Sequence, residues 1–200
     1  MNFLAHTYLA GPHEDARLGG LLGDFVKGPL DGPTLAHLPA SVRAGIGLHR
    51  HIDSYLDTLP AFVASRARVA ARYRRVAGIM IDVFYDHFLA RHWARFSDEP
   101  LEDFAAGVYD MLDARADLLP PTLARLRHYM REDDWLVSYR DLETPGAVLA
   151  RMARRLSRPD LLAGAGGELE SHYAGLEADF FAAMADLTPE TTLWRRQAGL

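Results

Sequence analysis

Apolar residues recur along this chain every three or four positions, which is the spacing of amphipathic helices. The sequence has no alternating apolar and polar runs ended by Asn-Gly or Asp-Gly turns, the pattern of β-hairpins. Breaks at Gly and Pro delimit predicted helices over residues 2–9, 14–26, 39–56, 60–73, 76–96, 100–119, 122–133, 144–156 and 160–187, and a short helix from Pro189. We therefore expect an all-α helical bundle that forms a single domain over residues 1–200.

The length and composition are those of a soluble globular protein. The chain has 200 residues, of which 49% are hydrophobic, and this suffices for one sizeable core. No apolar run approaches the roughly 20 residues that a membrane-spanning helix needs, and the first residues lack the basic segment of a signal peptide. We therefore expect a cytoplasmic protein that does not bind a membrane.

Charge, cysteine content and missing motifs exclude several classes of function. The net charge of -5 argues against a general nucleic-acid-binding protein. The chain has no cysteine, so it has no disulfide, thiolate zinc site or cysteine nucleophile, and a metal ion would need nitrogen and oxygen ligands. The nucleophile elbow of serine hydrolases, the P-loop and the dinucleotide-binding fingerprint are also absent.

The predicted helix over residues 76–96 carries two acids inside the most apolar stretch of the chain. Asp82 and Asp86 are four residues apart and therefore share a helix face, with His87 beside the second acid. A buried charge is costly unless it is paired or binds a metal, and two like charges on one buried face cost more. This helix therefore requires either a metal ion or a set of basic partners.

Three other predicted helices offer groups that can bind a metal. His49 and Asp53 repeat the four-residue spacing, and His6 lies in the apolar first helix. Asp24 lies near the end of the second helix, where the helix dipole disfavours a carboxylate, beside glycines that predict close helix packing. Each group has a structural alternative: a surface ion pair, a hydrogen-bonded core histidine, or a solvent-facing acid. Because bundles hold metals with ligands on facing helices, their repetition predicts one or two divalent ions, Mn²⁺ or Mg²⁺ rather than Zn²⁺.

Two arginine-rich segments stand out in this acidic chain. Residues 58–81 contain five arginines and no acid, and residues 151–158 contain four arginines and no acid. The usual explanation is a solvated helix face, and the alternative is a docking surface for an acidic macromolecule. The candidate docking residues of the first segment are Arg66, Arg68, Arg72, Arg74 and Arg75.

Several short motifs follow one another in a fixed order. They are Met1-Asn-Phe-Leu-Ala-His6, Gly23-Asp-Phe-Val-Lys-Gly28, Gly45-Ile with His49-Arg50 and Ile52-Asp53, Asp82 with Asp86-His87-Phe88-Leu89-Ala90 and Trp93, and Trp135-Leu-Val with Tyr139-Arg140. Together they resemble the acyl carrier protein phosphodiesterase family, from residue 1 to about residue 141 and more loosely beyond. One position departs from the pattern: family members often carry a second His two residues after the first, and Tyr8 stands there.

This resemblance implies hydrolysis of the phosphodiester that joins 4′-phosphopantetheine to a serine of holo-acyl carrier protein. It also implies a helical, Mn²⁺-dependent enzyme with an HD-like fold, distantly related to the HD-domain metal phosphohydrolases, in which Asp24 is essential. In HD proteins a His precedes the Asp, whereas Asp86 precedes His87 here. The ligands of the HD enzymes therefore do not transfer residue by residue.

The residue patterns and the resemblance together give the candidate site. The predicted metal ligands are His6, Asp24, His49, Asp53, Asp82, Asp86 and His87. The predicted catalytic residues are Asp24, Arg50 and Lys27, and the two cations would support charge on the phosphate oxygens. Arg140 is a further candidate cation for the phosphate or the carrier.

Three functions are compatible with these residues. The first is the carrier-protein phosphodiesterase, whose small acidic protein substrate gives the arginine-rich segments a purpose. The second is an HD-like metal phosphohydrolase that acts on a small substrate such as a nucleotide, which leaves the arginines without a role. The third is a non-enzymatic binding module in which the acids only pair with arginines, and a metal analysis of the purified protein would distinguish it from the other two.

Overall fold

The structure, a computed structural model, describes residues 1–154 and 158–200. Within these residues every regular element is a helix or a helical turn, which confirms the all-α prediction. The α-helices are α1 (Phe3–Leu9), α2 (Glu14–Leu22), α3 (Ala40–Leu56), α4 (Pro60–Arg68), α5 (Ala77–Arg91), α6 (Leu101–Ala114), α7 (Pro121–Glu132), α8 (Trp135–Ser138), α9 (Thr144–Ala153), α10 (Gly167–Ser171) and α11 (Tyr173–Ala198).

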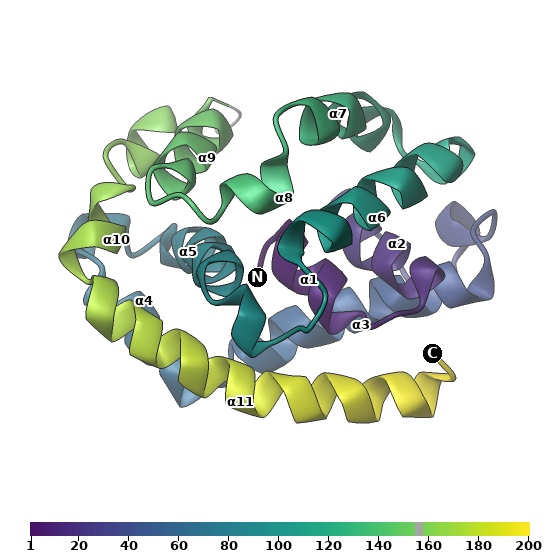
Figure 1. The fold of residues 1–200 in the computed structure, drawn as a ribbon, viewed down its shortest axis with the longest axis horizontal. Helices are drawn as coiled ribbons and strands as arrows, with labels where there is room; N and C mark the ends of the chain where they lie inside the picture. The colour runs from purple at the N-terminus through teal and green to yellow at the C-terminus, as the bar shows by residue number, and fades with distance from the viewer. Residues whose placement is uncertain (155–157) are drawn as a thin grey trace.

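The helices form layers around the first part of the chain. Helices α7, α8 and α9 lie above α1 and α5, while α11 runs along the lower edge (Figure 1). The first residue lies in the middle of the molecule, between α1 and α5 (Figure 1). In the described part of the chain, no helix combines the length and the apolar character needed to cross a bilayer.

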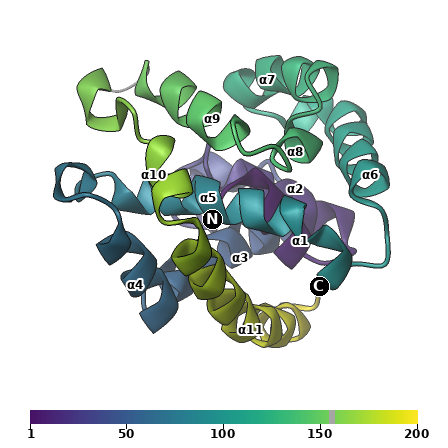
Figure 2. The ribbon, with the colours of Figure 1, turned by 60° about the vertical axis from the view of Figure 1, so that its left-hand side comes forward.

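Helix α5 is the centre of the core. It contacts α1, α4, α9 and α11, and Figure 2 shows these helices around it. Almost every residue from Met80 to Ala90 is buried, which is why the sequence of this helix shows no single apolar face. Of the two acids predicted to interrupt this apolar helix, Asp86 lies within the core and Asp82 is partly exposed.

Helices α2 and α3 pack with their backbones nearly in contact. A Cβ atom on Gly19 would lie 2.3 Å from the carbonyl oxygen of Val42, and one on Gly45 would lie 2.6 Å from that of Ala16. Only glycine fits at such distances, so the predicted close packing of the second helix is confirmed. This contact fixes α3 against the turn that follows α2.

Two predicted helix ends are wrong in ways that affect the site. The second helix ends at Leu22 rather than residue 26, so Asp24 lies in the following turn. The fourth helix ends at Arg68 rather than residue 73, because Val69 and Ala70 are extended, with ψ angles of 150° and 146°. The arginine-rich segment therefore continues beyond α4 through a 3₁₀ turn at Ala71–Tyr73.

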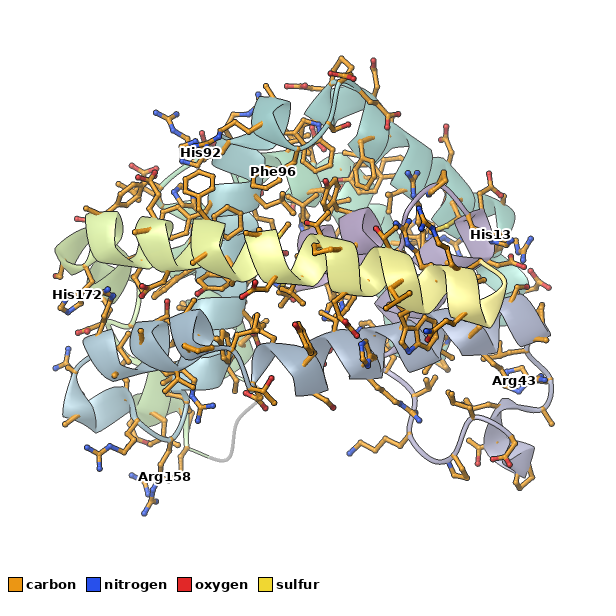
Figure 3. The ribbon with its side chains drawn as sticks, turned by 90° about the horizontal axis from the view of Figure 1, so that it is seen from below. His13, Arg43, His92, Phe96, Arg158 and His172 are labelled. Carbon is orange, nitrogen blue, oxygen red and sulfur yellow. The ribbon has the colours of Figure 1, made fainter. Side chains whose placement is uncertain are left out.

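The last part of the chain also departs from the predicted pattern. Instead of one helix over residues 160–187, the chain forms a short turn, α10, and then α11, which continues through Pro189. Proline removes one backbone hydrogen bond, but α11 packs along both α3 and α4, and this packing outweighs the local cost (Figure 3). The predicted end of a helix at Leu156 lies outside the described residues.

Candidate metal centre

His6 on α1 and His49 and Asp53 on α3 form a compact cluster of possible metal ligands. One ligand atom from each lies within 4.8 Å of the others. The Nε2 atoms of His6 and His49 are each 3.2 Å from the Asp53 carboxylate, on Oδ1 and Oδ2 respectively. The two imidazole rings stack with their centroids 3.8 Å apart. Two imidazoles and one carboxylate from two helices therefore converge.

The His6 ring is buried without a hydrogen-bond partner. Its Nδ1 atom has no polar partner within the described residues, and the only polar contact of Nε2 is Oδ1 of Asp53 at 3.2 Å, outside hydrogen-bonding geometry. An unpaired buried polar group costs about 1–3 kcal/mol. Burial, reinforced by the neighbouring His49, lowers the pKa of His6 to about 3, so the ring is neutral near pH 7 and keeps a free lone pair. A divalent ion would satisfy this nitrogen, so the residues present fit a metal.

Helix α2 orients the second imidazole. The Nδ1 atom of His49 lies 2.7 Å from the carbonyl oxygen of Gly20, which directs Nε2 toward Asp53 and, at 3.8 Å, toward Asp24. Metal-binding histidines commonly donate their other ring nitrogen to a backbone carbonyl in this way. A Cβ atom on Gly23 would lie 2.2 Å from the His49 ring, so the turn after α2 closes on the ring from behind.

The pKa values of the two carboxylates beside His49 shift in opposite directions. Burial would raise the pKa of Asp53, but the imidazoles of His49 and His6 outweigh it and hold the pKa below its usual value. Burial raises the pKa of Asp24, and the negative charge of Asp53 adds to this effect while His49 opposes it. Asp53 is therefore the more readily ionised of the two carboxylates. Asp24 is 43% exposed and is better placed to exchange a proton with water.

Asp82 approaches the cluster from α5. Its Oδ1 atom is 2.7 Å from the amino nitrogen of Met1, and that nitrogen is 3.5 Å from Oδ1 of Asp53. A positive group thus lies between two of the predicted ligands, and no motif in the sequence indicates it. Asp53 and Asp82 also line a surface hollow together with Asp57, which opens this side of the cluster to solvent.

Asp86 does not face the cluster. Its oxygens accept hydrogen bonds from the backbone N–H groups of Asn2, Leu4 and Ala5, at 3.3, 2.9 and 3.1 Å. Burial raises the pKa of Asp86 to about 7, against the lowering effect of these donors. The side chain therefore caps the start of α1, and the structure does not place it with the candidate metal ligands.

His87 is also separated from the cluster. Its Nδ1 atom lies 2.8 Å from the carbonyl oxygen of Tyr139, and its Nε2 atom lies 3.2 Å from the hydroxyl of Tyr173. Both ring nitrogens are therefore occupied on the other side of α5. The prediction that His87 belongs with the ligands fails because the residue after Asp86 points to a different neighbour.

The cations predicted to support the phosphate, Arg50, Lys27 and Arg140, have other surroundings. Arg50 donates from Nη1 to the carbonyl oxygen of Gly28 at 2.7 Å and so ties α3 to the loop that carries Lys27. Lys27 is exposed and forms no ion pair within the described residues. Arg140 pairs with Glu102 at 2.7 Å on the surface. The structure therefore brings none of these cations to the cluster.

The sequence that forms the cluster is similar to those of known proteins. The sequence profile described as "Acyl carrier protein phosphodiesterase" matches residues 1–187. The chain belongs to this family. The acyl carrier protein phosphodiesterases of Escherichia coli O157:H7 and of Escherichia coli strain K12 / DH10B are each 40% identical to it over 182 residues, which cover 90% of this chain and 92% of theirs.

The match to the acyl carrier protein phosphodiesterase family includes the cluster of His6, His49 and Asp53 and the flanking Asp24 and Asp82. The family expected from the ordered motifs is therefore confirmed. No solved structure matches the chain. The distant relationship to HD-domain enzymes accordingly stays a prediction.

Proposed function

We propose that this chain, a member of the acyl carrier protein phosphodiesterase family, hydrolyses the serine–phosphopantetheine diester of holo-acyl carrier protein with a Mn²⁺ ion at His6, His49 and Asp53. The products are apo-carrier and 4′-phosphopantetheine. The observation that carries the proposal is the buried His6 ring, whose one polar contact is the Asp53 carboxylate shared with His49, in a chain that matches the family over residues 1–187. We also propose that the protein acts in the cytoplasm.

The donor set supports the choice of metal. Two imidazoles suit Mn²⁺ better than Mg²⁺, which prefers oxygen ligands. Asp24 and Asp82 flank the three central residues and would complete the shell of one ion or hold a second. Asp86 and His87 are left out of this set because their polar atoms are engaged elsewhere.

The residues in and beside the cluster have different roles in the proposed reaction. A divalent ion held there would supply Lewis-acid activation of water and would neutralise charge on the phosphodiester. Asp24 is half-exposed, has a raised pKa and lies beside His49, so it can accept the proton of the attacking water. His49 is kept in one orientation by Gly20, which fixes the geometry around the reacting phosphorus.

Incubation with holo-carrier and Mn²⁺ tests this function directly. We expect the mass of the carrier, followed by mass spectrometry, to fall by that of the 4′-phosphopantetheine group. The same protein treated with a chelator should leave the carrier unchanged, and apo-carrier is the control for nonspecific cleavage. An unchanged holo-carrier, in the presence of protein that has bound Mn²⁺, would show that the proposal is wrong.

The proposed docking surface for the acidic carrier lies between α4 and α5. Arg72, Arg74 and Arg75 form no ion pair within the described residues. Together with Arg158, which projects at the edge of the molecule in Figure 3, they line one surface hollow. Arg158 is paired with Asp160 at 2.7 Å, so an acidic partner would meet uncompensated positive charge at Arg72, Arg74 and Arg75.

Arg66 and Arg68 contribute less to this surface than the sequence suggests. Arg68 binds Asp179 of α11 through two hydrogen bonds, of 2.6 and 3.1 Å, and Arg66 pairs with Asp57 at 3.2 Å. Asp179 is far from Arg68 in the sequence, and Asp57 lies just outside the arginine-rich segment, so neither pairing is apparent from the segment itself. The charge reversals that test docking should therefore leave both residues unchanged.

Replacing Arg72, Arg74 and Arg75 with Glu is expected to raise KM for holo-carrier by about 10-fold or more. Each exposed pair contributes about 0.2–1 kcal/mol, and reversal also adds repulsion. Turnover of a small diester, bis(p-nitrophenyl) phosphate, should not change, and the salt dependence of kcat/KM should become weaker.

The matched control for this variant reverses three exposed arginines elsewhere in the chain: Arg91 at the far end of α5, Arg125 on α7 and Arg196 on α11. It changes the net charge by the same amount, so it separates a local surface from the overall field of the protein. Equal effects of the two triple variants, or an unchanged salt dependence in the first, would place the docking surface elsewhere.

A further inference from the structure

A cleft opens beside the candidate metal centre, under the layer of α7, α8 and α9 that Figure 1 shows above α1. It encloses about 590 Å³ of space, part of which is open to solvent. The chemistry proposed at the cluster gives this cleft no role.

The walls of the cleft are mostly apolar, with a few polar groups. Phe3 and Phe25 lie with their ring centroids 6.0 Å apart, and the Arg151 guanidinium lies 5.0 Å from the centroid of the Trp135 ring. Leu126, Val148 and Met152 complete the side formed by α7 and α9. Such a lining suits a narrow chain that carries methyl groups, methylenes and hydrogen-bond acceptors.

Two residues that line the cleft adjoin residues of the candidate metal centre. Phe25 directly follows Asp24, and Phe3 lies one helical turn before His6 on α1. The polar floor is formed by the Tyr139 hydroxyl, which accepts a 2.5 Å hydrogen bond from Asn2.

A phosphodiester bound at the cluster links two groups, the carrier protein and the pantetheine arm. The surfaces on the two sides of the cluster differ in polarity. On one side is this apolar cleft. On the other side is the hollow lined by Asp53 and Asp82, which also includes Gly78 and Ile79 at the start of α5. The unpaired arginines directly precede α5 in the chain, so the charged carrier and the apolar part of its prosthetic group have separate places to bind.

We propose, on the basis of the function above, that this cleft holds the pantetheine arm of the carrier and determines which prosthetic groups are released. The dimethyl group and methylenes of the arm contact Phe3 and Phe25, and its amide carbonyls accept hydrogen bonds from Arg151. The sulfur lies toward Val148 and Met152, where an acyl group on it meets apolar side chains.

Filling the cleft tests this inference. Val148→Trp is expected to raise KM for holo-carrier by about 10-fold, since a 1.4 kcal/mol loss of binding is a factor of about ten. It should also abolish inhibition of this reaction by free pantetheine, while turnover of bis(p-nitrophenyl) phosphate stays unchanged. The matched control is Leu193→Trp, at an exposed apolar position of α11 outside the cleft.

Arg151→Ala provides a second variant that does not depend on fitting a larger side chain, because Arg151 is exposed. It should raise KM for holo-carrier without affecting the small diester. If the unmodified protein cleaves holo-carrier and both variants match it in KM and in pantetheine inhibition, the cleft does not hold the arm. If the unmodified protein cleaves bis(p-nitrophenyl) phosphate but not holo-carrier, the proposed function itself is wrong.

Discussion

Replacing Asp53 with alanine is expected to abolish both Mn²⁺ binding and hydrolysis of holo-carrier. Asp53 is the only carboxylate that contacts both imidazoles, at 3.2 Å from each, among the described residues. Loss of a group that merely supports a metal ligand costs about 10–100-fold in affinity or activity, so loss of the central ligand should cost more than about 100-fold. Metal content after dialysis and mass spectrometry of the carrier measure the two effects.

Asp24→Ala should separate the two effects. We expect this variant to lose turnover but to keep bound metal, because Asp24 lies 3.8 Å from His49 and stands half-exposed at the edge of the cluster. Its thermal stability should not fall, since the substitution removes a carboxylate that is close to other carboxylates.

Asp57→Ala is the matched control, as Asp57 is one turn from Asp53 and is exposed. An Asp53→Ala protein that retains normal metal content and turnover would show that the reaction takes place elsewhere.

Asp86→Ala is expected to produce the largest loss of stability among these variants. The substitution leaves three backbone N–H groups at the start of α1 without an acceptor. At about 1–3 kcal/mol for each unpaired buried donor, we expect unfolding to become easier by at least about 3 kcal/mol. For a chain of this size the midpoint of thermal unfolding should then fall by about 6–12 °C.

Calorimetry or circular dichroism would measure this loss, with Asp98→Ala, in the exposed loop before α6, as the control. The result also separates the two roles assigned to Asp86. A variant that unfolds at the normal temperature but no longer binds metal would show that Asp86 is a ligand, as its sequence pattern suggests, rather than a helix cap.

The sequence predicts the central part of the site because that part depends on local geometry. His49 and Asp53 are one turn apart on a helix, and this spacing alone places them on one face. The same rule puts Asp82 and Asp86 on one side of α5. It does not indicate that the neighbour of Asp86 is the backbone of α1, because that contact joins residues more than 80 positions apart.

Long-range contacts also explain the other differences between prediction and structure. The charge of Arg68 is compensated by Asp179, and α11 continues through Pro189 because it packs on α3 and α4. Both effects come from tertiary packing, which overrides local propensity. The apolar cleft was missed for the same reason, since residues near the start of the chain form it together with α7, α8 and α9.

The close contact between α2 and α3 has a consequence for mutational tolerance. Gly19, Gly23 and Gly45 have no room for even a methyl group, and Gly23 lies directly against the His49 ring. A substitution at any of them must separate the two helices or rotate the imidazole away from Asp53. In a random library, loss of activity would therefore arise at positions with no charge, no nucleophile and no ligand atom, where the only requirement is the absence of a side chain.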